Sequence, residues 1–310
     1  MIRQLAGDVR TLLGRADTSF RCCDTDFEIH ARGPNAERAV AEARRTARSL
    51  EAQLNAFADD SAVARLNREG SVTNRHVAAV VERGLEYGDR TDGVFDVRQG
   101  AVEHDLKAYV RGETDSVMPE FGDGSVTVEG ETVRTDAPLD LNGLAKGYVV
   151  DRAAEVLTGV GPFGFERPGI GRAGVGPTGI GRSGFVNGGG DISSPTGPVG
   201  VESPYGDDDP LTVLDTDWNV ATSAGYERRR GDVDHLYNPV TEQVGTPHDI
   251  VTVVAERDCT EADALATTLA ALPADEAVAL ADGWEGAEAL VVHQGVFHRT
   301  EAFSNHVHVA

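Results

Sequence analysis

The chain contains 310 residues, a length that allows one large or two ordinary domains, and its 40% hydrophobic content excludes wholesale disorder. Its 28 Lys and Arg side chains against 51 Asp and Glu side chains give a formal net charge of −23. This charge repels phosphate backbones at long range and argues against a protein that binds nucleic acid.

Cysteine content and hydropathy narrow the class of protein further. Three cysteines, of which Cys22 and Cys23 are adjacent, are too few for a disulfide scaffold and lack the paired spacing of a zinc site. No run of about 18 apolar residues is present to span a membrane. Residues 1–15 lack the continuous apolar stretch of a secretory signal. We therefore expect a cytoplasmic protein without a membrane span.

The basic side chains are almost all arginine, because only Lys107 and Lys146 are lysines. An acidic chain with few lysines is typical of proteins from concentrated salt, where charge repulsion is screened within a few ångströms. We expect a halophilic source, and the alternative is an ordinary acidic protein. The scarcity of lysine also makes Lys146 a residue of interest.

The first half of the chain is predicted to hold a strand, three helices and a hairpin. Apolar residues recur at helical spacing in the helices, and short alternating segments indicate strands. The expected ranges are a strand over 20–32, helices over 35–57, 74–89 and 143–157, and a hairpin of 125–129 and 131–134 around Gly130.

Glycine dominates residues 159–190, which contain thirteen glycines and a near-repeat. Such a segment cannot offset the entropy lost on ordering, so a mobile Gly-rich insertion is expected at 159–184. Mixed strands and helices without regular alternation then predict an α+β fold. The expected elements are strands near Phe185 and at 199–202, 211–215 and 250–255, a helix over 260–272 with Thr260 as N-cap, and a hairpin of 290–293 and 296–299.

Residues 139–151 read Leu-Asp-Leu-Asn-Gly-Leu-Ala-Lys-Gly-Tyr-Val-Val-Asp and pass from a strand end through Gly143 into a helix. The free N–H groups at the start of a helix suit a phosphate. Lys146 in the first turn opposes the helix dipole, a local cost that an anionic ligand would offset. The alternative is a capping Asp140 and a surface lysine.

A second glycine turn lies in residues 185–192, Phe-Val-Asn-Gly-Gly-Gly-Asp-Ile, where Asn187 and Asp191 bracket three glycines. Because glycine has no Cβ, this turn could pass beneath an aromatic ring or a phosphate. The alternative is that it forms only the edge of the Gly-rich insertion.

Residues 222–239 bring hydroxyls, an aromatic residue and His235 together in the sequence. His235 could accept a proton or donate a hydrogen bond to phosphate, and a structural histidine is the alternative.

Asp263 and Thr267 lie four residues apart on the helix predicted over 260–272, so their oxygens share a face. A carboxylate and a hydroxyl on the first turn are hard ligands that suit Mg²⁺. The alternative is that Asp263 stabilises the helix N-terminus and Thr267 packs against it.

In this order the segments resemble the FAD:protein FMN transferase family, also called the ApbE family. The resemblance runs from about residue 21 to residue 290, and it is specific because several weak motifs occur in the family's order. The matching segments are Phe57 to Asn67, Gly93 to Asp96, Asp140 to Tyr148, Asn187 to Asp191, Ser223 to Tyr226 with His235 to Pro239, and Ala262 to Thr267.

The resemblance implies a single ApbE-like (T-fold-like) domain at 20–310, after an N-terminal extension at 1–19, with mixed sheets and packed helices. It implies Mg²⁺-dependent transfer of FMN from FAD to a threonine hydroxyl of a target flavoprotein, with release of AMP. By position, the metal ligands would be Asp263, Thr267 and the Gly143 carbonyl. The FAD contacts would be Cys23, Phe57, Phe95, Asp96, Asp140, Lys146, Asn187 and Asp191.

The sequence departs from the family pattern near its start. Cys23-Asp24-Thr25 replaces Met-Gly-Thr, so Cys23 stands where a methionine usually touches the flavin. Phe57 stands where a tyrosine is common, and the Gly-rich insertion is not a family feature. Members are often exported lipoproteins, but no lipobox cysteine is present here.

Two catalytic side chains are expected beside the metal. Lys146 would place positive charge near the pyrophosphate oxygens. His235 or a carboxylate such as Asp140 would remove the proton from the acceptor hydroxyl. The rival functions are a Mg²⁺-dependent FAD pyrophosphatase that yields FMN and AMP, and a non-catalytic FAD-binding protein. The sequence identifies neither the acceptor protein nor the oligomeric state.

Overall fold

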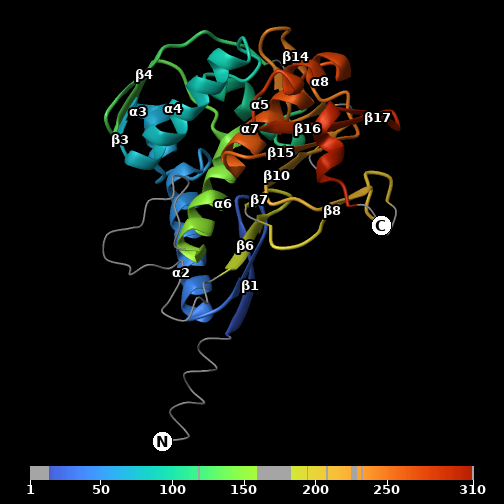
Figure 1. Ribbon diagram of the computed structural model, residues 1–310. Coiled ribbons are helices and arrows are strands. Elements are labelled where there is room, and N and C mark those ends of the chain that lie inside the picture. Colours follow the sequence, from blue (N-terminus) through green and yellow to red (C-terminus); the bar gives the residue numbers. More distant parts are fainter. Residues whose placement is uncertain are drawn as a thin grey trace, which may run out of the picture.

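One large antiparallel sheet and a layer of helices organise the chain (Figure 1). The computed structural model describes residues 14–117, 119–158, 183–193, 195–206, 209–224, 229–231 and 233–308. No helix within these ranges is long and apolar enough to cross a membrane. Most of the expected Gly-rich insertion, together with Gly225 and Tyr226, lies outside the described residues.

The large sheet has eight strands, and every neighbouring pair is antiparallel. Its central strand β15 is wholly buried, as expected of a β-branched run with strands on both sides. In spatial order the strands are β1 (Arg15–Cys22), β2 (Thr25–Arg32), β6 (Ser183–Gly188), β7 (Ile192–Ser193), β10 (Asn219–Ser223), β15 (Ile250–Ala255), β16 (Ala287–His293) and β17 (Val296–Arg299).

The single strand predicted over 20–32 is wrong, because this segment is part of a hairpin of β1 and β2. Its two-residue turn consists of Cys23 and Asp24, with φ of 53° and 58°. Two positive φ angles define the type I′ turn, which matches the twist of a hairpin and usually uses Asn or Gly. Cysteine and aspartate therefore gave no turn signal. Since β1 begins at Arg15, part of the expected 1–19 extension belongs to the sheet.

The helices form one layer that follows the order of the strands. Helix α2 packs on β1 and β2, α6 on β6 and β7, α7 on β10 and β15, and α8 on β16, while each helix also contacts the next. Figure 1 shows α2 and α6 running side by side. The four helices are α2 (Ala36–Leu54), α6 (Asn142–Thr158), α7 (Cys259–Ala270) and α8 (Ala274–Asp282).

A smaller lobe covers one end of this helix layer. It contains a three-stranded antiparallel sheet in the order β3-β5-β4, in which β4 and β5 form the predicted hairpin. Helices α3 and α5 and strand β3 were not predicted from the sequence. The elements of the lobe are α3 (Ala62–Glu69), β3 (Ser71–Thr73), α4 (Arg75–Arg90), α5 (Gly100–Val110), β4 (Val126–Glu129) and β5 (Thr132–Thr135).

Short ladders complete the fold. Strands β8 and β9 occupy the positions predicted at 199–202 and 211–215, while β11 to β14 and the final 3-10 helix were not predicted. They are β8 (Val199–Val201), β9 (Thr212–Leu214), β11 (Arg229–Arg230), β12 (Val233–Asp234), β13 (Tyr237–Asn238), β14 (Gln243–Val244) and η2 (Glu301–His306).

The start of α7 differs from the prediction. Asp258, not Thr260, is the N-cap, and its side chain accepts a hydrogen bond from the Glu261 N–H at 2.9 Å. The Thr260 hydroxyl instead donates to Asp151 on α6 at 2.6 Å. Asp151 also accepts from the backbone N–H groups of Cys259 and Thr260. A carboxylate on α6 thus satisfies free N–H groups of α7 and ties the two helices together.

Candidate active site

Two adjoining clefts open around the first turns of α6. The main cleft encloses about 1030 Å³ and the side cleft about 620 Å³, each measured with its open mouth, and both are lined by Asn142 and Lys146. The main cleft is lined in addition by Phe95, Asp96, Asp140, Gly143, His235, Tyr237, Asp263 and Thr267, and the side cleft by Cys23, Glu51, Phe57 and Lys107.

Helices α6 and α7 pack closely against each other beside the main cleft, which is lined by Gly143 and Lys146 of α6 and by Asp263 and Thr267 of α7. A Cβ on Gly147 would lie 2.5 Å from the Cys259 carbonyl oxygen, and one on Gly143 would lie 2.9 Å from the Phe95 ring. Only glycine fits these positions without displacement of a neighbour. The missing side chains let the backbone of α6 reach the side chains of α7.

Three oxygen groups meet across this contact. The Thr267 hydroxyl lies 3.4 Å from the Gly143 carbonyl oxygen, and Asp263 accepts from the Gly147 N–H at 2.9 Å. Asp263 is the fifth residue of α7, so it lies in the second turn and not in the first turn as predicted. Carboxylate, hydroxyl and carbonyl oxygens are the donors that Mg²⁺ prefers, so this donor set could hold that ion.

Lys146 provides the positive charge of the main cleft. Its ammonium lies 2.8 Å from the Asp191 carboxylate, which is fully buried. Burial alone would lower the pKa of Lys146, but the charges of Asp191 and Asp263 outweigh it and raise that pKa. Burial, followed by the charge of Asp263, raises the pKa of Asp191. Lys146 therefore stays charged across the physiological range.

The glycine turn of residues 187–191 supplies Asp191, the acidic partner in this ion pair. Asp191 lines neither cleft, and Asn187 borders a separate groove and accepts a hydrogen bond from the Gly190 N–H at 3.0 Å. A Cβ on Gly189, which does line the main cleft, would collide with Thr25. Of the expected FAD contacts, Asn187 and Asp191 are thus placed behind the cleft, where they hold the turn and Lys146.

Asp140 is held firmly at the rim of the main cleft. One carboxylate oxygen accepts from the Asn142 backbone N–H and side-chain amide, both at 2.8 Å, and the other accepts from the Tyr237 hydroxyl at 2.6 Å. Burial and the neighbouring carboxylate of Asp140 raise the pKa of Tyr237, so its hydroxyl stays protonated as a donor. His235 lines the same cleft two residues before Tyr237.

Phe95 and Asp96 also line the main cleft, and the carbonyl of the next residue, Val97, accepts from the Asp140 N–H at 2.7 Å. The Phe95 ring packs edge-on against Tyr87, with ring centroids 6.0 Å apart. The Asp96 carboxylate accepts from Arg98 at 2.7 Å and from Gln99 at 2.8 Å. The Phe95 ring is therefore held by packing, and the Asp96 carboxylate is already hydrogen-bonded to neighbours in its own turn.

The side cleft is lined by the aromatic ring of Phe57 and by Lys107, the other lysine of the chain. The Phe57 ring stacks on His104 at 4.7 Å, and the Lys107 ammonium lies 4.3 Å from the centre of the Phe57 ring. Lys107 also pairs with Glu103 at 2.7 Å, and Glu103 accepts from Asn142. The sequence analysis singled out Lys146 alone, although the scarcity of lysine applied equally to Lys107.

Comparisons with known proteins agree with this architecture. The family model described as the ApbE family matches residues 23–162 and 179–291. A protein of Treponema pallidum named FAD:protein FMN transferase is 29% identical over 307 residues, which cover 85% of this chain and 80% of that protein.

Solved structures have the same fold. The ApbE protein of Thermotoga maritima superposes with a TM-score of 0.76 at 21% identity, covering 96% of this chain and all of that chain. The flavin transferase ApbE of Vibrio cholerae gives 0.69 at 19% identity, covering 95% of this chain and 99% of that one. These likenesses confirm the predicted α+β, ApbE-like fold. Because the family model spans most of the sequence, the chain belongs to the ApbE family.

Proposed function

We propose that this protein is a Mg²⁺-dependent FAD:protein FMN transferase, which moves FMN from FAD to a threonine hydroxyl of a target flavoprotein and releases AMP. The observation that carries this proposal is the floor of the main cleft, where Lys146 lies beside Asp263, Thr267 and the Gly143 carbonyl. A cation and a hard-oxygen donor set side by side suit a pyrophosphate. The relative from Treponema pallidum carries the same activity in its name.

FAD would lie across both clefts. Its pyrophosphate would sit at the start of α6, where the positive end of the helix dipole and the Lys146 ammonium attract negative charge. Its flavin ring would enter the side cleft against Phe57, with Cys23 on the opposite border. Asn142 and Lys146 line both clefts and would mark the point where ring and phosphates join.

In the transfer, the threonine oxygen attacks the FMN phosphorus and forms a phosphoester bond. The bond from that phosphorus to the bridging oxygen breaks, and AMP leaves with the electron pair. Lys146 stabilises charge on the phosphate oxygens without a change in its own protonation. Asp263, Thr267 and the Gly143 carbonyl would hold Mg²⁺, which when bound neutralises phosphate charge.

The geometry favours His235 over Asp140 as the group that takes the proton. Three hydrogen-bond donors already occupy the Asp140 carboxylate. The imidazole of His235 lines the same cleft, and this group accepts protons near neutral pH. In this assignment, Asp140 keeps the start of α6 and Tyr237 in place.

Mass spectrometry of an acceptor tests the proposal. The protein is incubated with FAD, Mg²⁺ and an acceptor flavoprotein domain that lacks its FMN, at high salt, beside the same domain with its threonine replaced by alanine. We expect an FMN adduct on the threonine-bearing acceptor alone, together with an equal amount of AMP. Free FMN and AMP without an adduct would establish the pyrophosphatase instead. FAD that stays bound and intact would establish a binding protein.

A further inference from the structure

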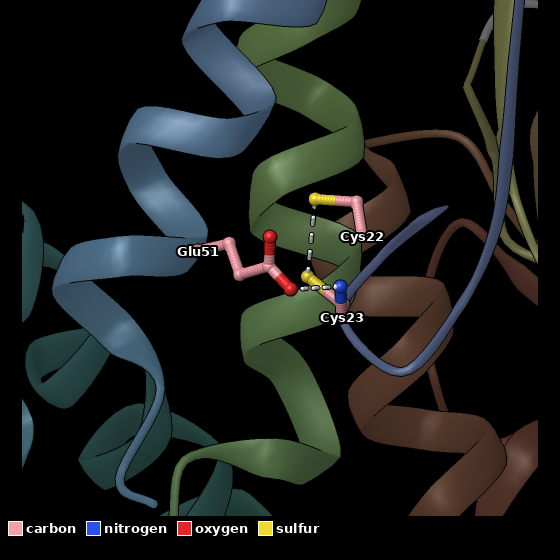
Figure 2. A group of neighbouring side chains, drawn as sticks. All are labelled: Cys22, Cys23 and Glu51. Atoms are coloured by element: carbon pink, nitrogen blue, oxygen red, sulfur yellow. Dashed lines mark hydrogen bonds between the residues drawn. The ribbon is translucent and has the colours of Figure 1, made fainter. Parts of the chain in front are cut away.

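Two thiols and a carboxylate converge at the turn between β1 and β2 (Figure 2). The Sγ atoms of Cys22 and Cys23 are 3.9 Å apart, and the Glu51 carboxylate of α2 accepts from the Cys23 N–H at 2.7 Å. One sulfur from each cysteine and one Glu51 oxygen all lie within 4.8 Å of one another. Among the described residues, these three form the one group of at least three His, Cys, Asp or Glu side chains that meets this spacing.

The backbone of the turn is what brings the two thiols together. Successive side chains of a strand point to opposite faces, so adjacent cysteines in a regular strand would diverge. Cys23 instead adopts a left-handed conformation with φ 53°, which non-glycine residues rarely adopt. Figure 2 shows both sulfurs on the side that faces Glu51.

The sulfur separation fits metal ligands better than a disulfide. Two thiolates on a tetrahedral Zn²⁺ with Zn–S bonds of about 2.3 Å are roughly 3.8 Å apart. A disulfide requires sulfurs about 2.05 Å apart and Cα atoms at least about 4.4 Å apart. Consecutive residues on a trans peptide have Cα atoms only about 3.8 Å apart, which disfavours that bridge. All three cysteines are free thiols here.

The cluster is closed on one side and open on the other. Cys22 is 1% exposed and anchors the group in the core, while Cys23 and Glu51 line the side cleft. A cation could enter from the cleft and keep a fourth coordination position toward it, as three-ligand zinc sites do. The sequence lacks the paired Cys-x-x-Cys spacing of a zinc site, but the fold builds a different ligand set from adjacent cysteines and a glutamate 28 residues after Cys23.

We propose that Cys22, Cys23 and Glu51 bind one thiophilic divalent cation, of the class represented by Zn²⁺, at the border of the side cleft. Two thiolates and a carboxylate select zinc-like ions over Mg²⁺, which prefers oxygen ligands alone. The site shares no ligand with the donor set of Asp263, Thr267 and Gly143. Its existence therefore does not depend on the proposed transferase activity.

Cobalt substitution tests the site without any flavin. The metal-free, reduced protein is titrated with Co²⁺ in excess Mg²⁺, and the visible spectrum is recorded before and after addition of Zn²⁺. We expect the intense absorption of tetrahedral thiolate-bound Co²⁺ to saturate at one ion per chain and to disappear when Zn²⁺ is added. Absence of that absorption in the parent protein would overturn the proposal, whatever the result of the transferase assay.

Four variants identify the ligands. Cys22→Ser and Cys23→Ser should each weaken the thiolate absorption, because one of the two thiolates is lost, and the double variant should remove it. Glu51→Gln should weaken Zn²⁺ binding at least about tenfold while its amide oxygen still accepts from Cys23. The matched control is Cys259→Ser, which changes the buried third cysteine on α7 and should bind like the parent. Thermal unfolding checks each variant. If Cys22→Ser does not fold, the variants at the half-exposed positions Cys23 and Glu51 still test the site. Metal binding that is unchanged in both of these variants would contradict the proposal.

Discussion

The positive charge of Lys146 is stabilised by neighbouring carboxylates in the protein itself. Asp191 lies 2.8 Å from its ammonium, and Asp263 adds a second buried carboxylate. Removal of one partner from such a buried group leaves an uncompensated charge. The same side chain is therefore important for stability, and in the proposed function it would also attract a pyrophosphate.

A paired substitution separates these two roles. Lys146→Met should lower the melting temperature and reduce turnover of FAD at least about tenfold, or about 1.4 kcal/mol in the barrier. The double variant with Asp191→Asn removes both members of the 2.8 Å ion pair and leaves only Asp263, so its melting temperature should partly recover while its turnover stays low. Recovery of turnover in the double variant would show that Lys146 acts on the fold alone.

Asp263 allows a substitution that preserves its hydrogen bond. Asp263→Asn keeps an oxygen to accept from the Gly147 N–H but removes the negative charge. We expect Mg²⁺-dependent flavin transfer to fall below detection while thermal unfolding changes little. Asp275→Asn, at an exposed position on α8, is the control and should behave like the parent. Transfer at the parent's rate in Asp263→Asn would exclude this residue as a metal ligand.

For single residues, the sequence predicted contacts within one helix better than contacts between different helices or strands. Asp263 and Thr267 share a face because they are four residues apart, and this spacing is visible in the sequence. The contact of Lys107 with Phe57 joins α5 to the turn that follows α2, across 50 positions, and depends on how the lobe packs. No local pattern encodes such a contact.

The α6–α7 contact determines how accurately the floor of the main cleft is built. Its two glycines replace side chains that would separate the helices. Because these glycines lie within a helical pattern, the sequence predicted the helix but not its neighbour.

Gly147→Ala measures how tightly these helices meet. The new Cβ would lie 2.5 Å from the Cys259 carbonyl oxygen and 2.9 Å from the Asp263 Cβ. Overpacking of this kind destabilises by about 1–3 kcal/mol, and it should also weaken Mg²⁺ dependence by displacement of Asp263. Gly197→Ala is the control, because its Cβ would meet nothing within 4 Å. Equal stability of the two variants by urea unfolding would contradict the close contact.

Asp151 makes the attachment of α7 sensitive to pH. Burial, followed by the charge of Asp258, raises the pKa of Asp151 from 3.8 to about 7. Between these values the folded state holds a proton that the unfolded state has released, so stability is highest below pH 3.8 for this group and falls as pH rises toward 7. Asp151→Asn should flatten this part of the profile.

Urea unfolding across that pH range provides the measurement. The free energy of unfolding of the parent protein should decline more steeply with pH than that of Asp151→Asn. Asp60→Asn, at an exposed position, is the control for general charge effects and should retain the slope of the parent. Parallel profiles for all three proteins would mean that Asp151 is ionised throughout.

Element types were predicted well wherever a period was clear, as in α2, α4 and α6. Errors arose where backbone geometry overrode residue type. Cys23 and Asp24 form a type I′ turn without Asn or Gly, so two strands were merged into one. The N-cap of α7 is Asp258 and not the predicted Thr260, because the Thr260 hydroxyl donates to Asp151 of another helix.

The whole molecule carries a formal charge of −23, which opposes compaction. Dissolved salt screens this repulsion, and the Debye length falls from about 10 Å at 0.1 M to about 3 Å at 1 M. The melting temperature should therefore rise from dilute buffer to molar KCl. A neutral osmolyte at matched osmolality is the control for general exclusion effects. A melting temperature that stays level or falls with KCl would contradict adaptation to salt.

The two helices at the floor of the main cleft are synthesised at different times. Gly147 and Asp263 hydrogen-bond across 116 positions of the chain. A ribosome that adds roughly 5–20 residues per second completes α2 and α6 long before α7 emerges. Nascent or prematurely ended polypeptides thus lack the carboxylate and hydroxyl of α7. The segments that precede α7 therefore build most of both clefts before the side chains proposed to hold Mg²⁺ are in place.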